Sequence, residues 1–467
     1  MEGAATMKYS RELTESQQPS LSRAASTLIT QWRWLVLHPR ILKHILSSTL
    51  AAMILCLSPQ ALSAPTAESF RLPSTPGGLD PLQCWYALGS TPDGSIYIAA
   101  SDHKTNSALF EKRTGDQAFR YVGDAQHASM LANNWETGET LEKFHVRPTY
   151  LDGDIYLGGL NYSYYNQGYS KKRGFHWYRY RPSTGQFEDL SAQAPDGTAS
   201  PFQLEYLIAD PKHHRLYGAA VPKGHLVRFD PHTQKTEDLG RPPELKKNYL
   251  PSDSFMWVNS RGRVYFAMEG RGGWFKRIHY FDPNSNTFGT MDDWKLQGPP
   301  PRKKGKQKQQ VKGGLKPSPI GRIPKVGQCD PSGKRCYMSD NNGRIYRWRE
   351  TGNAEQWTYL GQVRFPAPHE KQRLATRTFQ LSADEKSIYM VNERYLGAPD
   401  ILLHRFDIAT GHSEVIAPLS QLAPEAVGEG RELHCGHNAW DAEGRFYIAS
   451  FGMSGKGGNV VVTAIKP

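Results

Sequence analysis

The sequence of 467 residues has no long hydrophobic run, few cysteines and a shortage of acidic side chains. Its apolar run at residues 45–57 is shorter than the roughly 20 residues that a membrane-spanning helix needs. It contains no P-loop, dinucleotide-binding glycine fingerprint, GxSxG nucleophile elbow or HExxH motif. These absences argue against the common nucleotide-binding enzymes, α/β serine hydrolases and zinc proteases.

Basic residues outnumber acidic ones, with 57 Lys and Arg against 45 Asp and Glu, and the net charge is +12. This balance suggests an anionic partner, which can be a nucleic acid, a membrane surface or an acidic polysaccharide. Glycine, proline and tyrosine are plentiful, with 43, 32 and 23 residues. So many turn-forming and aromatic residues argue against disorder and against a helix bundle, and they favour a turn-rich all-β protein.

Residues 1–64 have the pattern of a secretory signal peptide. Arg33, Arg40 and Lys43 precede the apolar run, and small residues follow it up to Ala64. We therefore expect a secreted or periplasmic protein with no membrane span after signal removal; an uncleaved signal anchor is the alternative. Removing these residues lowers the net charge only from +12 to +9, because six basic and three acidic residues leave. For a basic exported protein, an anionic polysaccharide is the expected partner, and nucleic acid is not.

A strand of the form apolar-Tyr-apolar recurs about every 58 residues. Its seven copies contain Tyr97, Tyr156, Tyr217, Tyr265, Tyr337, Tyr389 and Tyr447. Most copies follow a turn, often with Asp or Asn close to Gly, which is a hairpin signal, and two further strands come after each. Seven units of four antiparallel strands predict a seven-bladed β-propeller over residues 65–467. The length then requires one domain only, and a sandwich or two-domain arrangement is the alternative.

The two ends of the repeat and one insertion depart from this pattern. The last unit stops after its third strand at Pro467, so we expect residues 68–73 to supply the fourth strand. The ring would then be closed by N- and C-terminal strands in one blade. Residues 299–322 are rich in Pro, Gly and Lys and lack aromatic residues, which predicts a flexible basic insertion. It is either a solvated loop or a cationic arm that attracts a polyanion.

In a propeller, the innermost strand of each blade begins near the mouth of the axial channel, where ligands usually bind. The repeated tyrosines are expected to be structural, as are four arginines at equivalent third-strand positions: Arg179, Arg228, Arg347 and Arg405. Candidates at the mouth are His127, His145, Arg147, Tyr206, Glu269, Arg271, Arg377, Arg394, His434 and His437. The tract 161–177 adds Tyr162, Tyr165 and His176. Aromatic faces among cations suit sugar rings that bear carboxylate or sulfate groups.

Four cysteines follow the signal segment. Cys329 and Cys336 flank one turn, while Cys84 and Cys435 begin the inner strands of the first and last units, which are neighbours in a closed ring. Two disulfides match an oxidising compartment. The alternative is a divalent metal, zinc or calcium, held by His434, Cys435 and His437 together with Cys84. No other cofactor is indicated.

The exported seven-fold repeat, the His-bearing segment before the second unit, the FHVRP sequence at its start and the cationic tyrosine-rich tract resemble the β-propeller polysaccharide lyases, ulvan lyases above all. The resemblance implies that His127 and His145 bind substrate and transfer protons. It implies that Tyr206 acts at the reacting centre and that Arg228 neutralises a uronate carboxylate. Further substrate-binding residues are expected at Arg147, Tyr162, Tyr165, His176, Arg271, Arg377 and Arg394.

The chemistry of such a lyase is β-elimination, in which the C5 proton of a uronic acid is removed and the 4-O-glycosidic oxygen is expelled. Arg or a metal must neutralise the carboxylate, and His and Tyr transfer the protons. Hydrolysis would usually need two opposed carboxylates, whereas Glu269 alone is expected at the mouth. We therefore expect a monomeric, secreted lyase of a uronic-acid-containing polysaccharide. The alternatives are a non-catalytic propeller that binds glycans or an envelope protein, and a propeller lactonase or streptogramin-type lyase.

Overall fold

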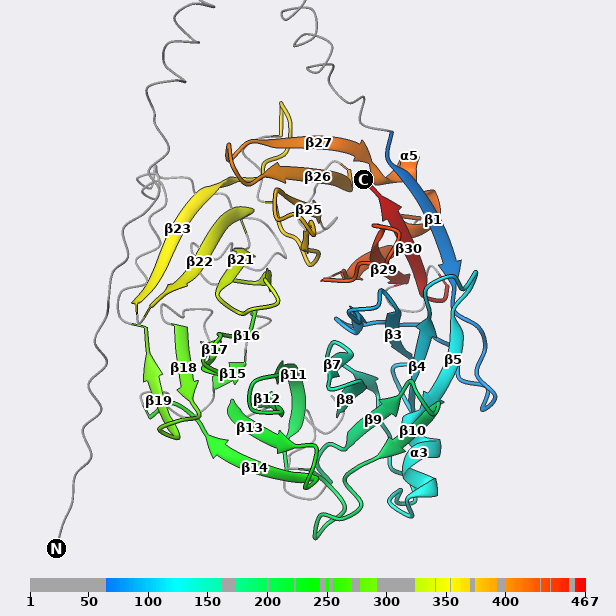
Figure 1. Cartoon of the computed structure of the whole chain (residues 1–467). Helices are drawn as coiled ribbons and strands as arrows, with labels where there is room; N and C mark the ends of the chain where they lie inside the picture. Colours follow the sequence, from blue (N-terminus) through cyan, green and yellow to red (C-terminus); the bar gives the residue numbers. More distant parts are fainter. Residues whose placement is uncertain are drawn as a thin grey trace, which may run out of the picture. The chain divides into compact units, whose positions relative to one another are not determined.

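Seven antiparallel sheets, here called blades 1 to 7, stand in a ring in the computed structural model of the compact unit Pro65–Pro467 (Figure 1). This ring is a seven-bladed β-propeller, which confirms the predicted fold class. The structure describes residues 64–161, 173–199, 201–221, 224–243, 249–251, 255–270, 278–291, 324–340, 342–352, 354–369, 374–392, 400–428, 430–436, 438–452 and 458–467.

Two predicted segments lie outside these residues: the signal peptide, apart from Ala64, and the basic insertion at 299–322. Export and a cationic arm therefore remain predictions from the sequence. In the part of the chain that the structure describes, no helix is both long enough and apolar enough to span a membrane.

Blades 1 to 6 are built outward from the axis in chain order, so the first strand of each is innermost (Figure 1). Blade 1 contains β2 (Leu88–Ser90), β3 (Ile96–Ser101), β4 (Ser107–Lys112) and β5 (Arg120–Asp124). Blade 2 contains β6 (Lys143–Phe144), β7 (Thr149–Leu151), β8 (Asp154–Leu160), β9 (Trp177–Arg181) and β10 (Gln186–Asp189). Blade 3 contains β11 (Gln203–Asp210), β12 (Arg215–Val221), β13 (His225–Asp230) and β14 (Lys235–Gly240). Blade 4 contains β15 (Tyr249–Pro251), β16 (Trp257–Val258), β17 (Val264–Gly270), β18 (Ile278–Asp282) and β19 (Thr287–Thr290).

The remaining blades follow the same plan. Blade 5 contains β20 (Val326–Cys329), β21 (Arg335–Ser339), β22 (Arg344–Thr351) and β23 (Ala354–Gln362). Blade 6 contains β24 (Gln380–Leu381), β25 (Ser387–Val391), β26 (Leu402–Asp407) and β27 (Ser413–Pro418). Blade 7 contains β28 (Arg431–Cys435), β29 (Phe446–Gly452), β30 (Val461–Lys466) and β1 (Thr66–Arg71). Short helices connect some blades: α3 (Ala125–Leu131), α5 (Leu419–Leu422) and the 3-10 helix η2 (Pro424–Ala426).

Blade 7 is assembled from both ends of the unit. β1 pairs antiparallel with β30, from Thr66 opposite Lys466 to Arg71 opposite Val461 (Figure 1). The predicted ring closure is therefore confirmed, with a strand that begins two residues earlier than expected. Closure leaves blade 7 with a complete sheet, and each of its apolar faces is covered by a neighbouring blade.

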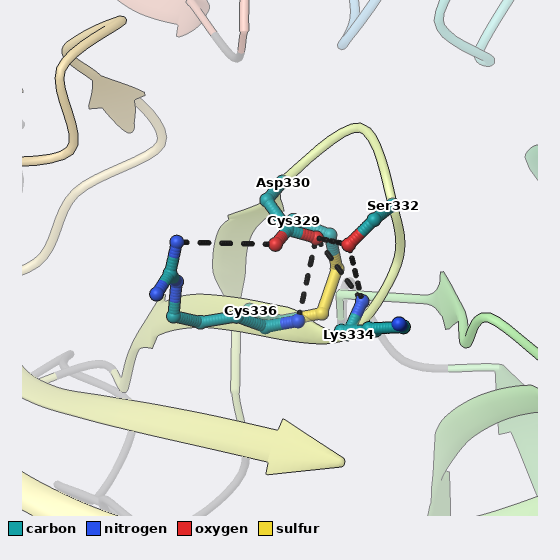
Figure 2. The surroundings of a disulfide bond; sticks show 6 residues. Cys329, Asp330, Ser332, Lys334 and Cys336 are labelled. Carbon is teal, nitrogen blue, oxygen red and sulfur yellow. Dashed lines mark hydrogen bonds and ion pairs between the residues drawn. A yellow bond between two sulfur atoms is a disulfide. The ribbon is translucent and has the colours of Figure 1, made fainter. Parts of the chain in front are cut away.

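The hairpin turns carry Asp and Gly for a physical reason. Figure 2 shows the turn of blade 5, where Asp330 Oδ1 accepts hydrogen bonds from the backbone N–H groups of Lys334, at 3.1 Å, and of Arg335. Gly333 in this turn has a φ of 66°, which glycine adopts without steric cost. The strands beside the turn are joined by the predicted Cys329–Cys336 disulfide (Figure 2).

Four of the repeated tyrosines pair with the repeated arginines across strands, in agreement with the structural role that their regular spacing predicts. In four blades, the second-strand Tyr lies opposite the third-strand Arg, in the pairs Tyr156–Arg179, Tyr217–Arg228, Tyr337–Arg347 and Tyr389–Arg405. In three of them, the Arg also forms an ion pair with a fourth-strand Glu, in the pairs Arg179–Glu188, Arg228–Glu237 and Arg405–Glu414. These arginines therefore tie the outer strands of a blade together.

The second predicted disulfide joins Cys84 of blade 1 to Cys435 of blade 7, across a sequence separation of 351 residues. Both cysteines are buried. The bond therefore links the first blade in the chain to the blade that closes the ring. The Cys329–Cys336 bond closes a loop with a separation of only 7 residues.

Replacing Cys84 and Cys435 together by Ala should destabilise the propeller more than the same change at Cys329 and Cys336. Loop-closure entropy gives about 6 kcal/mol for a crosslink across several hundred residues and about 2–3 kcal/mol for a short one. Urea unfolding of both double variants, monitored by tryptophan fluorescence, measures the difference. Equal losses would contradict the role of the long-range crosslink in holding the ring.

His404, a third-strand residue of blade 6, is fully buried, and neither ring nitrogen has a hydrogen-bond partner among the residues that the structure describes. Burial lowers its pKa to about 4, so the folded protein resists a proton that the unfolded chain accepts. Folding stability should therefore fall as the pH drops from about 6.5 towards 4, by about 2 kcal/mol between pH 7 and pH 5 from this group.

His404→Leu should remove this part of the acid sensitivity, and His412→Gln in an exposed turn of the same blade should not. Urea unfolding at pH 7 and pH 5 compares the three proteins. The same loss between the two pH values in wild type and His404→Leu would rule out His404 as its source.

Candidate functional site

An axial cavity of about 450 Å³ is lined by the innermost strands of the propeller. Tyr86 of blade 1, His145 and Arg147 of blade 2, and Tyr206 of blade 3 all line it. Lys325 adds a cation from blade 5. The acidic residues of the described lining lie at the far ends of innermost strands: Asp210 is the last residue of β11, and Asp330 directly follows β20.

Breaks in the innermost strands give the site its polar side chains. In blade 2, β6 and β7 both pair with β8, and residues 145–148 lie between them. In blade 3, the register shifts between Leu204 and Tyr206, so Glu205 is the extra residue of a β-bulge. Blade 7 has the same irregularity at His434, between Leu433 and Cys435. A bulge turns side chains away from their regular alternation, which places polar groups where a regular strand would have a core residue.

His145 is a deeply enclosed titratable side chain of the cavity lining, with 3% of its surface exposed. Its Nδ1 lies 3.3 Å from the backbone oxygen of Glu205 and 3.4 Å from Glu205 Oε1. Its ring centroid lies 5.2 Å from that of Tyr86. Burial, together with the nearby Lys143 cation, holds the pKa of His145 well below its usual range. The imidazole is therefore neutral at neutral pH and can accept a proton.

Two arginines bring positive charge to the same place. Arg147 lines the cavity, and its separation from water lowers its pKa to about 10, so it stays charged at neutral pH. Arg377 of blade 6 donates a hydrogen bond to the Tyr86 hydroxyl, with its guanidinium carbon 5.3 Å from the ring centroid. Gly89 allows blade 1 to approach Arg147, because a Cβ there would lie 2.8 Å from the Pro148 oxygen.

An aromatic cluster adjoins His145 around Trp85, which is half-buried. The Lys143 ammonium lies 4.1 Å from the Trp85 ring centroid, a cation–π contact. The rings of His434, Phe451 and His103 lie 4.6, 5.1 and 6.0 Å from that of Trp85. Three blades therefore contribute aromatic and cationic groups beside the cavity.

Two residues that the family resemblance marks as catalytic lie elsewhere. His127 is exposed on α3, which packs against β5 and β10 at the rim of the ring (Figure 1). Arg228 lies on β13, the third strand of blade 3, in a cross-strand triad with Tyr217 and Glu237. The axial cavity is lined by His145 and Tyr206 but by neither of these two. The four residues therefore do not surround one cleft.

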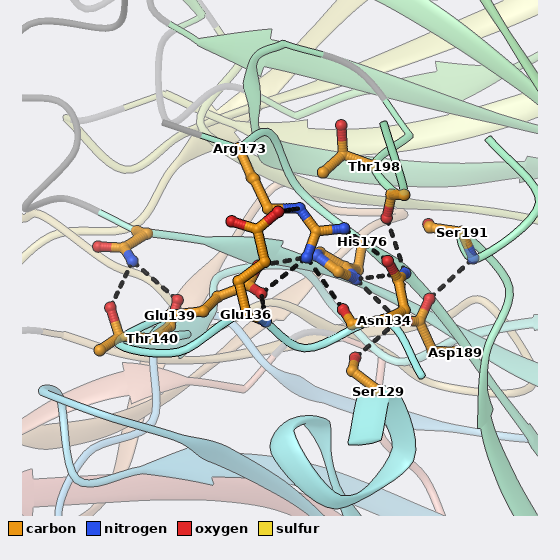
Figure 3. Close-up of polar contacts among 12 residues, drawn as sticks. Ser129, Asn134, Glu136, Glu139, Thr140, Arg173, His176, Asp189, Ser191 and Thr198 are labelled. Carbon is orange, nitrogen blue, oxygen red and sulfur yellow. Dashed lines mark hydrogen bonds and ion pairs between the residues drawn. The ribbon is translucent and has the colours of Figure 1, made fainter. Parts of the chain in front are cut away.

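His176, predicted to bind substrate, instead holds a buried network beside blade 2 (Figure 3). Its Nδ1 lies 2.7 Å from Asp189 Oδ2, and its Nε2 lies 3.0 Å from Glu139 Oε1. Arg173 donates to Glu139, and Asn134 donates to Asp189. Burial alone would lower the pKa of His176, but hydrogen bonds to the two carboxylates raise it to about 9. A protonated His176 between two acids therefore joins the segment before blade 2 to the blade itself.

The alternative metal site is not assembled as predicted. The Cys435 sulfur is bonded to Cys84, so it is not a thiolate ligand. His434 Nε2 lies 2.9 Å from Glu432 Oε2. Across the described ranges, no group of three or more His, Cys, Asp and Glu side chains is arranged to hold a metal ion. His437 lies outside those ranges, as do Tyr162, Tyr165, Arg271 and Arg394, and the side chain of Glu269 is not described.

Sequence reasoning missed five residues of the site: Trp85, Tyr86, His103, Lys143 and Glu205. Tyr86 has a φ of 58° and His103 also has a φ of 58°, so both sit at irregular backbone positions that no repeat pattern reveals. Trp85 and Tyr86 directly follow Cys84, in the segment that leads into the innermost strand β2. That neighbourhood was a usable signal, because the start of an innermost strand faces the mouth.

The fold and the site define a β-propeller with a polar axial mouth. No protein-family model matches the sequence, and no curated protein matches it. Among solved structures, the chain is similar to the β-propeller domain of Cps50 (Swd1) from Myceliophteria thermophila, at 9% identity and a TM-score of 0.47, over 85% of this chain and 100% of that one. It is also similar to U3-55K, at 9% identity and a TM-score of 0.48, over 85% and 98%.

A chain of the mitotic checkpoint complex is similar at 8% identity and a TM-score of 0.50, over 99% of this chain and 98% of that one. At such low identity the likeness concerns the fold alone. What the protein does must therefore be argued from its own residues.

The His176 network predicts a loss of stability at alkaline pH. The folded-state pKa of about 9 lies above the unfolded value of about 6.5, so the stabilisation is complete below pH 6.5 and is lost as the pH rises through 9. Between pH 7 and pH 9.5 the loss should be about 2 kcal/mol.

Urea unfolding at these two pH values should show the loss in wild type and in His232→Gln, a change in an exposed turn. His176→Gln should be less stable at pH 7 and lose less between the two values. If His176→Gln keeps the wild-type pH dependence of stability, the group that titrates is not His176.

Proposed function

We propose that the protein is a lyase that cleaves a uronic-acid-containing anionic polysaccharide by β-elimination at the mouth of the axial cavity. One observation carries this proposal: His145, Arg147, Tyr86 and Tyr206 line a single cavity, and Arg377 is bound to Tyr86. This is the set of side chains that elimination requires: a neutral base, a hydroxyl that can donate a proton, and cations for a carboxylate.

Each residue has a distinct task in the proposed reaction. The Arg147 guanidinium pairs with the uronate carboxylate, so that negative charge can develop on it when the C5–H bond breaks. His145 accepts the C5 proton, because its imidazole is neutral. The electron pair of that bond forms the C4–C5 double bond, and the bond from C4 to the glycosidic oxygen breaks. Tyr206 donates its hydroxyl proton to the departing oxygen.

The class of substrate follows from charge and compartment. Arg147, Arg377 and Lys325 are cations at or beside the cavity, and they favour a polyanion. The two disulfides and the signal-like residues 1–64 support export, where such polysaccharides occur. Nucleic acid would be an unexpected ligand in that compartment.

A second candidate is a propeller that binds the same polysaccharides without cleaving them. The burial of His145, at 3% exposure behind Tyr86, favours this candidate, because a base must reach the C5 proton of a sugar ring. Both candidates predict binding of an anionic glycan at the mouth, and only the lyase predicts an unsaturated product.

Incubation of the protein with ulvan and with pectin separates the two candidates. We expect ultraviolet absorbance from the unsaturated uronate product, and His145→Ala and Arg147→Ala should each lower the rate by roughly 100-fold or more. Each variant has a matched control of the same residue type away from the cavity, in His127→Ala and Arg228→Ala. Both controls should keep the wild-type rate.

Several outcomes would count against the assignment. Full activity in His145→Ala would remove this residue from the reaction. Loss of activity in Arg228→Ala with an unchanged melting temperature would restore that residue to the site. Binding that weakens with salt and in Arg147→Ala, without product from either polysaccharide, would favour the binding propeller.

A further inference from the structure

The geometry points to Glu205 as a positioning residue that fixes the tautomer of His145 and balances the positive charge around it. This inference rests on the proposed function, because it concerns the residue assigned there as the base. It adds a carboxylate that neither the tyrosine repeat nor the family resemblance marks.

The contacts of His145 determine where its proton lies. Nδ1 faces two oxygens of Glu205, the backbone oxygen at 3.3 Å and Oε1 at 3.4 Å. The backbone oxygen can accept a hydrogen bond but cannot donate one, and the same is true of Oε1 when the carboxyl group is ionised. Nδ1 must therefore carry the proton. The lone pair of the neutral ring is therefore on Nε2, which makes Nε2 the basic nitrogen.

The position of Glu205 is specified by the β-bulge of β11. Glu205 is the extra residue between Leu204 and Tyr206, and its side chain is only 7% exposed. A regular strand would point Glu205 and Tyr206 to opposite faces. The bulge instead allows one short segment to supply both the partner of His145 and a tyrosine of the cavity lining.

The charges around His145 make this carboxylate important. Lys143 of its own blade, His103 of blade 1 and His434 of blade 7 all oppose protonation of the ring. Tyr86 contacts the ring edge, and His434 is itself bound to Glu432. Glu205 supplies the negative charge on the other side of the ring. When His145 accepts a proton, this carboxylate lies beside the imidazolium that forms and stabilises it.

The experiment uses the full chain labelled with 15N-histidine, with His145→Gln to assign the His145 signals. At pH 7 we expect His145 in the Nδ1–H form. Glu205→Gln keeps the size of the side chain but removes its charge, so it should move His145 protonation to lower pH. Lys143→Met removes the opposing cation and should move it to higher pH. The pKa of His145 should therefore shift in opposite directions in the two variants. A general loosening of the fold would not produce opposite shifts.

Activity provides the second measurement. On a cleaved polysaccharide, Glu205→Gln should lower kcat by roughly tenfold or more with little change in KM, because the carboxylate acts on the base and not on the sugar. The pH–rate profile should shift in the same direction as the His145 titration. Glu205→Asp, which keeps the charge, should recover part of the rate.

Two results would overturn the inference: the Nε2–H tautomer in the wild-type protein, or an unchanged His145 titration in Glu205→Gln. These readouts need no substrate. If the wild-type protein cleaves neither ulvan nor pectin, the proposed function fails, while the tautomer and the titration still decide the role of Glu205.

Discussion

The pairing of β1 with β30 is the interaction on which the rest of the structure depends. It makes the last blade complete and fixes the place of each blade around the axis. The axial site needs this order, because Tyr86, His145, Tyr206 and Arg377 come from four different blades. No blade could build the site alone, so the six residue pairs between the two end strands of the unit organise a cavity to which several blades contribute.

Much of the fold could be predicted because the sequence signals for its strands and turns are local and repeated. Most of the seven tyrosine strands follow a turn, so the sequence repeats the strand and turn pattern of one blade seven times. The last unit lacks its fourth strand, and Cys84 and Cys435 lie near the inner strands of the first and last units. These two features indicate ring closure and its crosslink. Repetition also revealed which arginines are structural: Arg179, Arg228 and Arg405 each face a Tyr on one side and a Glu on the other.

The site was harder to predict because it lies where the repeat is broken. Glu205 occupies a bulge, and a one-residue shift of register leaves no mark in composition or spacing. His176 lies in a tract that suits a sugar site, yet two distant carboxylates, Glu139 and Asp189, enclose it. Arg228 fits both the structural repeat and the family resemblance. Its place on a third strand, opposite Tyr217, shows that it belongs to the repeat. The spacing of residues along the chain therefore does not reveal which side chains come together in the folded protein.

The antiparallel closure also has a mechanical consequence. Thr66 and Lys466 face each other at one end of the β1–β30 ladder, so a force that pulls the two ends apart loads the hydrogen bonds one after another. Strands loaded in this way unzip at lower force than strands sheared along their length. The tear would then reach the Cys84–Cys435 bond, which is covalent and stops it. Traction on the chain ends can therefore extract the closing strand while blades 1 to 6 stay inside a covalently closed loop.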